Sequence, residues 1–456
     1  MKEKKGTIRS GPLSPGGNVR GLQLARMFLT NNLTYFLARL ALRPLGRRLR
    51  PYQEAAVQGI LAELHAAYSG EKPVIFASAF VPTELIYGLG AIPVLPEVWS
   101  GFAAAAGFGA PAVTASEAAG YSQDLCSFHR CSLGLENLEL LPKPAAVIVS
   151  SHLCDGGRRS LYRHSRSFGC PFYVLDVPYA ATPDGAAWLA HQIERTARDL
   201  VLKVPGLSLA GLPGALAAAN RARTEYLAVC RLRRERPAPW AGSEALNYVA
   251  VFLSGWGSSW LPEFYAQLRC HLEEAIRRRA FPVPQERHRL LWLNLRPYYA
   301  TPIFTYLEKE CNTSTAFEEY SHLYWPAHTP EAWAESLAAK LVAHFGWGPI
   351  ERRLATVWSL VQEYGIDGVV QFNQWGCRQS NGGGRFLADF LRARGIPFLE
   401  LAGDGVDGRS SGAAQQLTRI AAFVELLEAR NTLPPGRRIE AITRQNEVHD
   451  HAGSRH

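Results

Sequence analysis

The sequence predicts an α/β protein with two Rossmann- or flavodoxin-like parallel-sheet domains that are related by a distant internal repeat. The chain has 456 residues, more than one hydrophobic core usually organises. Residues 146–159 and 368–394 each run from a short apolar strand, through a polar turn with a cysteine and glycines, into a helical pattern. In both halves a Gly-x-Pro sequence then leads into a strand with an acidic residue near its end, at 168–176 and 394–401.

The first 70 residues are predicted to lie outside both sheets. Residues 1–20 are rich in Lys, Gly, Pro and Ser, which is typical of a disordered basic tail. Residues 21–70 are predicted to be a helical region, with helical patterns at 22–49 and 51–68 and a stop at Ser69-Gly70.

The remaining elements follow in order along the chain. The first α/β domain is predicted over 71–205 and begins with a strand at 73–77. Pro82 then suits the first turn of a helix that Gly90 ends. Residues 206–285 are predicted to be a helical connector, and residues 286–430 a second α/β domain that opens with a strand at 289–297 and closes with a helix at 413–429. Residues 431–456 are predicted to be a disordered tail.

Composition limits the class of protein. The 47% hydrophobic content is typical of a globular protein, no apolar run is long enough to span a bilayer, and no secretory signal follows Met1, so we expect a cytoplasmic location. The net charge of +9 is compatible with a nucleic acid, a phosphate-rich small molecule or an acidic protein, but no nucleic-acid-binding pattern and no phosphate-binding glycine loop is present. The eight irregularly spaced cysteines do not resemble a disulfide framework.

Cys154 and Cys377 occupy matching places in the predicted repeat, each where a strand ends and a helix begins. Ligands of open α/β sheets bind beyond the carboxyl ends of the strands, so two facing domains would bring both sulfurs to one cleft. A thiolate, a phosphate or an anionic iron–sulfur cluster suits such a place. The alternative is a pair of buried cysteines in ordinary turns.

Two further residues are singled out by their position at the start of a predicted helix. Cys126 lies in an early helical turn, where a thiolate is stabilised as a metal ligand requires, and His129 next to it is either a donor to a ligand or a surface histidine. Glu84 lies in the first turn above the strand ends, where it either compensates the helix dipole or serves as an acid/base group.

The order of these motifs resembles the 2-hydroxyacyl-CoA dehydratase and benzoyl-CoA reductase family, and within it subunits like the D-component of 2-hydroxyglutaryl-CoA dehydratase. The resemblance covers about residues 73–427 and lacks the basic N-terminal extension. The stretches that carry it are Val81-Pro82-Thr83-Glu84-Leu85-Ile86-Tyr87-Gly88-Leu89-Gly90, Asp124-Leu125-Cys126-Ser127-Phe128-His129-Arg130, Cys154-Asp155, Tyr173-Val174-Leu175-Asp176-Val177-Pro178, Trp375-Gly376-Cys377-Arg378 and 395–404.

The resemblance implies a [4Fe-4S] cluster held by Cys126, Cys154 and Cys377, with one iron site left for water, sulfide or the oxygen of a thioester. It implies Glu84 as a proton-transfer group near that thioester. It also implies an acyl-CoA substrate, a related second subunit or a second copy of the chain, and a separate ATP-hydrolysing activator that supplies a low-potential electron. The substrate would become a ketyl radical, which eases loss of a hydroxyl group or reduction of an aromatic ring.

Two alternatives remain open at this point. Cys131 and Cys170 fall outside the three-cysteine pattern, and they are either buried thiols or signs of a larger cluster like that of the double-cubane reductases of small molecules. A non-catalytic scaffold with structural cysteines is the other alternative, although the Cys-x-x-Cys pairs typical of zinc sites are absent. Cys230, Cys270 and Cys311 are interpreted as structural.

Overall fold

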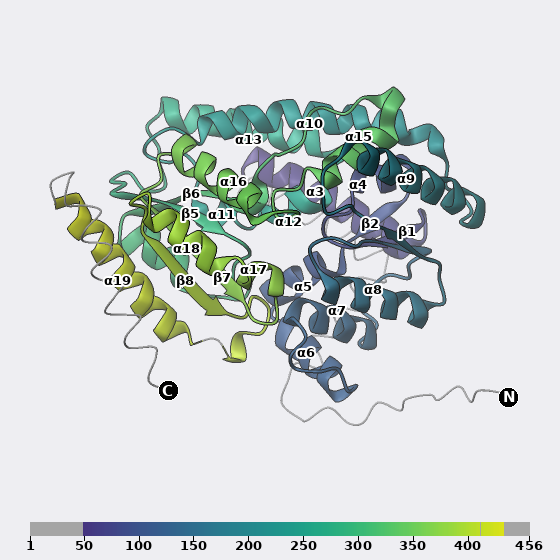
Figure 1. Cartoon of the computed structure of the whole chain (residues 1–456), viewed down its shortest axis with the longest axis horizontal. Coiled ribbons are helices and arrows are strands. Elements are labelled where there is room, and N and C mark those ends of the chain that lie inside the picture. The colour runs from purple at the N-terminus through teal and green to yellow at the C-terminus, as the bar shows by residue number, and fades with distance from the viewer. Residues whose placement is uncertain (1–48, 411, 433–456) are drawn as a thin grey trace.

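Eight strands form two separate four-stranded parallel sheets in the computed structural model, which describes residues 49–410 and 412–432 (Figure 1). The first sheet has the order β2-β1-β3-β4, with β1 (Val74–Ala77), β2 (Ile92–Val94), β3 (Ala146–Ser150) and β4 (Phe172–Leu175). The second has the order β6-β5-β7-β8, with β5 (His288–Leu293), β6 (Thr313–Glu318), β7 (Gly368–Gln374) and β8 (Phe398–Gly403).

The two sheets have the same topology, because each places its strands in the order second, first, third, fourth. This confirms the predicted α/β class with two Rossmann-like units, and it gives β3 and β7 equivalent central places. Both strands are buried along their whole length, as is usual for the central strands of parallel sheets. Strand β3 is almost entirely apolar, whereas β7 also contains the buried polar residues Gln371, Asn373 and Gln374. In the register of the sheets, Val147 is opposite Phe172 and Val369 is opposite Phe398.

Helices cover the first sheet and precede it. The N-terminal helix ends where Gly70 adopts the left-handed conformation that favours glycine (φ 74°). The helices of this half are α3 (Pro51–Ser69), α4 (Thr83–Gly88), α5 (Pro96–Ala105), α6 (Gly109–Ala118), α7 (Ser127–Asn137), α8 (Asp155–Phe168) and α9 (Pro183–Lys203). The predicted helix at 22–49 and the predicted tails lie outside the described residues.

The connector between the sheets is helical, with α10 (Leu212–Leu232), α11 (Gly242–Ala245), α12 (Val249–Ser254) and α13 (Leu261–Arg277). The helical connector predicted over 206–285 is therefore observed as a set of separate helices, and the break between α12 and α13 contains Gly255 and Gly257. Helices α10 and α13 pack side by side along the top of the view in Figure 1, where they bridge the two lobes.

The second lobe contributes the remaining helices. They are α14 (Ile303–Thr305), α15 (Trp333–Val342), α16 (Ile350–Glu363), α17 (Arg378–Asn381), α18 (Gly384–Arg392) and α19 (Ala413–Thr432). A π-helix (Tyr306–Glu310) follows α14, and short 3₁₀ turns lie at Leu209–Gly211, Glu319–Ser321, Pro330–Ala332 and Gly408–Ser410.

Helix α15 crosses to the other lobe, which the sequence analysis did not anticipate. Its chain position lies between β6 and β7 of the second sheet, yet Leu337 and Leu341 are fully or almost fully buried in the core around the first sheet, with Leu85, Leu189 and Ile193. Helices α15 and α9 also pack against each other. The two lobes are therefore interlocked rather than merely adjacent.

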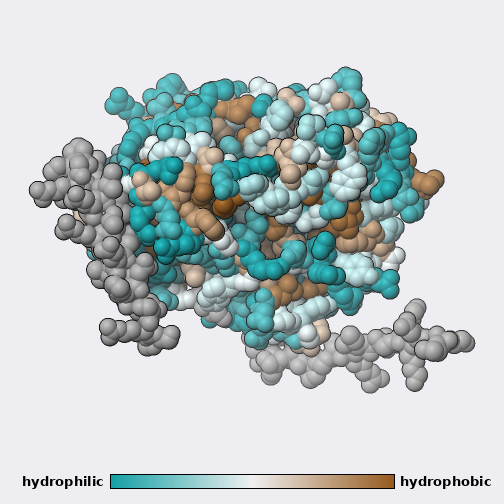
Figure 2. All heavy atoms as spheres, in the orientation of Figure 1, coloured by the Kyte–Doolittle hydropathy of each residue, from teal (hydrophilic) through white to brown (hydrophobic). Residues whose placement is uncertain are grey.

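Within the part of the chain that the structure describes, no helix has both the length and the apolar character needed to cross a membrane. Hydrophobic side chains reach the face drawn in Figure 2 in scattered groups among hydrophilic ones, including groups in the middle of that face between the lobes.

Candidate functional site

A cavity of about 270 Å³ lies where the carboxyl ends of both sheets face each other. Residues that follow β1 and β3 of the first sheet and β5, β6 and β7 of the second all reach it, as expected for ligand sites of parallel sheets. Its lining consists of Ala79, Phe80, Glu97, Val98, Gly101, Phe102, Ala105, Cys126, Phe128, His129, Leu153, Cys154, Asn247, Ala250, Leu253, Leu295, Tyr298, Tyr320, Gln374, Cys377 and Gln379.

All three cysteines singled out from the sequence line this one cavity. Each is the N-cap residue of a helix: Cys126 precedes α7, Cys154 precedes α8 and Cys377 precedes α17. Cys154 and Cys377 follow the equivalent strands β3 and β7, so the two matching turns of the repeat each bring one cysteine to the cavity. A helix N-terminus favours a thiolate, and the Cys154 sulfur accepts a hydrogen bond from the Gly157 N–H at 3.2 Å.

The loops that carry Cys126 and Cys377 touch through a glycine. Gly376 has a φ of 75°, and a Cβ atom there would lie 2.8 Å from the backbone nitrogen of Cys126. Only a residue without a side chain permits this approach of the two lobes. The contact is reinforced by Ser127, whose hydroxyl donates to Asp404 Oδ1 at 2.6 Å and accepts from Gln374 Nε2 at 3.0 Å.

Replacement of Gly376 by alanine is expected to destabilise the protein and to open this junction. The left-handed backbone costs alanine roughly 1–2 kcal/mol, and the new Cβ would collide with backbone. Gly120→Ala is a matched control, because Gly120 has a φ of 90° but no atom within 4 Å of a Cβ. A urea titration should give a larger loss of unfolding free energy for Gly376→Ala; equal losses would contradict the close-contact argument.

Burial governs the ionisation of the cysteines. Burial raises the pKa of the Cys154 thiol to about 12, with the nearby Glu97 carboxylate adding to the effect, and it raises the pKa of Cys126 well above the usual range. Both groups are therefore thiols at neutral pH in the ligand-free protein. A cationic metal centre reverses this, because thiolate ligation releases the protons.

His129 is buried beside Cys154, so its interpretation as a surface histidine is wrong. Its Nε2 lies 3.2 Å from the Cys154 sulfur and its Nδ1 lies 3.2 Å from the Ser160 hydroxyl. Burial lowers the pKa of His129 to about 4, and the ring is neutral at pH 7. The neutral ring can accept a hydrogen bond from the Cys154 thiol, or donate an N–H to its thiolate while Ser160 donates to the other nitrogen.

Glu97 is a cavity residue that the sequence analysis did not single out. It lies at the start of α5, immediately after β2, and its Oε2 atom is buried with no hydrogen-bond partner among the described residues. Burial raises its pKa to about 7, although the backbone N–H groups of Glu97 and Ala79 act in the opposite direction. In the sequence, Pro96-Glu97 follows a strand and begins a helix, so Glu97 lies in the same kind of strand-to-helix turn as Cys154 and Cys377. A carboxyl group that gains and loses a proton near neutral pH suits acid/base chemistry.

Glu84 lies in the first turn of α4, as expected, but the structure does not bring it to the cavity. Its side chain is fully buried, and Oε1 accepts from Lys340 Nζ at 2.7 Å and from His328 Nε2 at 3.2 Å. Burial alone would raise the pKa of this carboxyl group; the Lys340 ammonium and His328 outweigh burial and lower it to about 2. Proton transfer by Glu84 stays a prediction, and the geometry gives this carboxylate a role in joining α4 to α15.

The other cysteines lie away from the cavity. Cys131 is completely buried in the core of the first lobe, and Cys170 is at the edge of that core. All eight cysteines of the chain are free thiols. Cys270 is exposed on α13, which makes it a convenient control for substitutions at the cavity.

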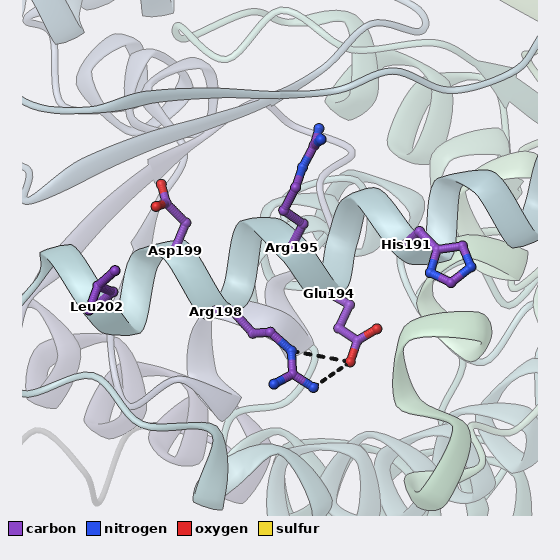
Figure 3. Close-up of a pocket in the computed structure, with 6 residues that line it drawn as sticks. All are labelled: His191, Glu194, Arg195, Arg198, Asp199 and Leu202. Atoms are coloured by element: carbon purple, nitrogen blue, oxygen red, sulfur yellow. Dashed lines mark hydrogen bonds and ion pairs between the residues drawn. The ribbon is translucent and has the colours of Figure 1, made fainter.

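A second hollow runs along α9, but it has the character of an ordinary helix surface (Figure 3). Its lining residues all come from successive turns of this one helix, and Arg198 donates to Glu194 across the hollow. The lining consists of His191, Glu194, Arg195, Arg198, Asp199 and Leu202. No second element supplies converging polar groups there, so the cavity between the sheets is the candidate site.

Three cysteine thiols line the cavity, and thiolates are the ligands that iron–sulfur clusters use. Among the described residues, no three His, Cys, Asp or Glu side chains are grouped closely enough to hold one metal ion between them.

Comparison with known proteins places these features in a family. The family model of the 2-hydroxyglutaryl-CoA dehydratase D-component matches residues 78–427. The (R)-phenyllactyl-CoA dehydratase alpha subunit of Clostridium sporogenes is 23% identical over 389 residues, which are 80% of this chain and 92% of the relative. The lactoyl-CoA dehydratase subunit alpha of Anaerotignum propionicum is 21% identical over 390 residues, 78% of this chain and 91% of the relative.

The alpha subunit of (R)-2-hydroxyglutaryl-CoA dehydratase from Acidaminococcus fermentans is 23% identical over 307 residues, which cover 64% of this chain and 62% of the relative. The match to the family model extends from just after β1 to Leu427 within α19, and it includes all three cavity cysteines, His129 and Glu97. The chain belongs to the 2-hydroxyglutaryl-CoA dehydratase D-component family.

Proposed function

We propose that this chain is the subunit of a 2-hydroxyacyl-CoA dehydratase that holds a [4Fe-4S] cluster through Cys126, Cys154 and Cys377. The observation that carries the proposal is that these three helix-capping cysteines, from both lobes, line one cavity together with a carboxyl group that titrates near pH 7. The family match and three relatives named as dehydratase alpha subunits support dehydration rather than ring reduction.

When bound, such a cluster supplies a low-potential electron and a Lewis-acidic iron that has an open ligand position. The protein's own contribution is to hold the three sulfurs and to exclude water with an apolar wall. The Nε2 atom of His129 lies 3.2 Å from the Cys154 sulfur and would hold that sulfur in position. Gly376 keeps the Cys377 loop against the Cys126 loop, so that both lobes form one ligand set.

Glu97 is proposed to move the proton. Dehydration of a 2-hydroxyacyl thioester breaks the C–O bond at C2 and removes one hydrogen from C3, and the products are a 2-enoyl thioester and water. The Oε2 atom of Glu97 has no partner among the described residues and so is available to accept the C3 proton and to pass it to the departing hydroxyl group. A pKa of about 7 makes both its forms accessible at neutral pH.

The proposal includes the partners of the reaction. The relatives' designation as alpha subunits supports a second subunit. We further propose that this subunit is related to the present chain and that a separate ATP-hydrolysing activator would deliver the electron. The chain itself has no phosphate-binding glycine loop, so ATP hydrolysis is assigned to that activator. The eight free thiols support a reducing compartment such as the cytoplasm.

The experiment that tests the function is an iron and acid-labile sulfide analysis of anaerobically purified protein, followed by turnover of 2-hydroxyacyl-CoA thioesters with an added activator. About four irons per chain and formation of a 2-enoyl thioester are expected. About eight irons per chain would favour the double-cubane alternative, which the placement of Cys131 and Cys170 away from the cavity does not support. Protein without iron or sulfide would point to a structural scaffold and refute the proposal.

Glu97→Gln is expected to lower kcat by about 10²–10⁴-fold, the usual contribution of a positioned acid or base. The substitution keeps the shape of the side chain and removes a buried ionisable group, so iron content and melting temperature at pH 7.5 should be retained. In the unaltered enzyme the rate should fall as the pH drops below about 7, because a protonated Glu97 cannot accept the C3 proton. A Glu97→Gln enzyme with full activity would remove this residue from the mechanism.

A further inference from the structure

Tyr320 forms part of the cavity wall that belongs to the second lobe. It lies in the 3₁₀ turn Glu319–Ser321, immediately after β6, and its side chain lines the cavity. The Glu319 carboxylate accepts from Arg353 Nε at 2.6 Å, and the Ser321 carbonyl oxygen accepts from the Tyr226 hydroxyl at 2.5 Å. Hydrogen bonds on both sides therefore fix the place of Tyr320 beyond the end of the strand.

Among the described residues, none accepts a hydrogen bond from the Tyr320 hydroxyl, although this side chain lines the cavity. The Tyr320 ring packs against the Phe80 ring, with their centroids 5.8 Å apart. Burial raises the pKa of the phenol above its usual value, and the nearby Cys377 and Glu319 add to the effect. The phenol therefore keeps its proton at neutral pH and can donate a hydrogen bond to a group that enters the cavity.

Most other side-chain donors in or beside the wall already have partners within the protein. The amide groups of Gln374 and Gln379 donate to other protein groups, and each ring nitrogen of His129 contacts a neighbouring side chain. Arg378 lies beside the cavity, but 84% of its side chain is exposed and its guanidinium group forms an ion pair with Asp155. None of these groups is a free donor inside the cavity.

The two remaining donors of the wall differ from Tyr320 in their surroundings. Asn247 is exposed to solvent. Burial raises the pKa of the Tyr298 phenol to about 12, with Arg296 acting in the opposite direction and no cavity cysteine contributing. Two of the three cavity cysteines do contribute to the raised pKa of Tyr320, so its phenol lies close enough to their sulfurs to interact with them. Tyr320 is thus the free donor on the cysteine side of the cavity.

A thioester brings a carbonyl oxygen into the cavity whatever its acyl chain. Burial of this oxygen without a hydrogen bond is unfavourable, so a bound thioester needs a donor. In the proposed reaction the low-potential electron also adds negative charge to the same oxygen. A donor that is already in place stabilises that charge more strongly than it stabilises the neutral substrate, and such a difference raises the rate.

We infer that the Tyr320 hydroxyl donates a hydrogen bond to the carbonyl oxygen of the bound thioester and is a catalytic residue of this cavity. The phenol keeps its proton throughout the reaction, while Glu97, from the first lobe, carries the C3 proton. This inference rests on the proposed function, because it adds a residue to the chemistry of the same site.

Infrared spectroscopy tests this hydrogen bond without turnover. Propanoyl-CoA lacks the 2-hydroxyl group and cannot be dehydrated, and an isotopic label at its thioester carbon separates its carbonyl band from the bands of the protein. With anaerobically purified protein and any subunit that accompanies it, the bound carbonyl band should lie at higher wavenumber in Tyr320→Phe than in the unaltered protein, because loss of the hydrogen bond strengthens the C=O bond. An unchanged band would overturn the inference and leave the proposed function in place. Failure of the unaltered protein to bind propanoyl-CoA would overturn both.

Turnover of a 2-hydroxyacyl thioester gives a second measurement on the same variant. Tyr320→Phe should lower kcat by about 10²–10³-fold, the usual effect of removing one donor from a developing negative charge, and should change KM little. The melting temperature and iron content should be retained, because the variant keeps the ring and loses only a hydroxyl group without a partner among the described residues. A Tyr320→Phe enzyme with full kcat would contradict the assignment.

Tyr324→Phe is the matched control. Tyr324 also follows β6 and packs among aromatic rings, with the Trp325 centroid 4.8 Å and the Phe345 centroid 5.7 Å away, but it borders a neighbouring small chamber and not the cavity. Loss of its hydroxyl group should change neither the carbonyl band nor kcat. Equal effects of the two substitutions would show that Tyr320 does not act at the thioester.

Discussion

On the proposed function, the Cys377→Ala protein is expected to fold and to lose the iron of the cluster. Cys377 caps a helix of only four residues and is partly exposed, so its removal leaves no sealed void in a hydrophobic core. The remaining sulfurs, Cys126 and Cys154, both belong to the first lobe, and two thiolates cannot retain a cluster that needs three or four protein ligands. Iron should therefore fall from about four per chain to below about one, together with the brown absorbance and all dehydratase turnover.

Two other cysteines provide the controls for this result. Cys270→Ala removes an exposed thiol on α13 and should leave the iron content unchanged. Cys131→Ala removes a completely buried thiol in the core of the first lobe, so it should lower stability without lowering iron in the folded fraction. If Cys377→Ala kept a full complement of iron, the ligand set proposed for the cavity would be wrong.

The second large effect concerns stability. Lys340→Met leaves the fully buried Glu84 carboxylate without its ammonium partner, and loss of one member of a buried ion pair typically costs about 3–5 kcal/mol. Lys340 also lies over the Trp325 ring at 4.0 Å, so its removal takes away a cation–π contact as well. A urea titration of the variant should give a correspondingly lower free energy of unfolding.

The double variant Glu84→Gln with Lys340→Met is the control, because it removes the stranded charge. It should recover much of the lost stability, and a double variant as unstable as the single one would show that packing rather than charge dominates.

The pH dependence of stability follows from the lowered pKa of Glu84. Its contribution to stability is present above the unfolded value of about 4.5 and is lost as the pH falls toward about 2, where the native carboxylate takes up a proton.

Local patterns in the sequence were sufficient to predict β1, β3, β4, β5, β7 and β8, the helices α3 and α19, and the equivalence of Cys154 and Cys377. These features depend on nearest neighbours along the chain: an apolar run, a polar turn, a glycine and a helical period. The same patterns suggested one cleft for Cys154 and Cys377, and both line a single cavity together with Cys126, because the carboxyl ends of parallel strands meet at one edge of each sheet.

The features that escaped prediction depend on pairs far apart in the sequence. The sequence shows only that Glu84 is a carboxyl group in the first turn of a helix. The fold places the ammonium group of Lys340, 256 residues later, 2.7 Å from that carboxylate. The burial of His129 could not be predicted for the same reason, because its partner Cys154 belongs to the next strand-to-helix turn along the chain. Glu97 carries no distinguishing local signal beyond its place after β2, and its raised pKa is a product of burial that only three-dimensional packing creates.

The crossing of α15 has a consequence for how this molecule could be divided. A fragment cut within the connector would carry the first sheet without Leu337 and Leu341, so the groove they fill beside Leu85 and Leu189 would lie open to water. The complementary fragment would expose the apolar face of α15 to water. Although the two halves share one topology, neither half is a self-sufficient folding unit.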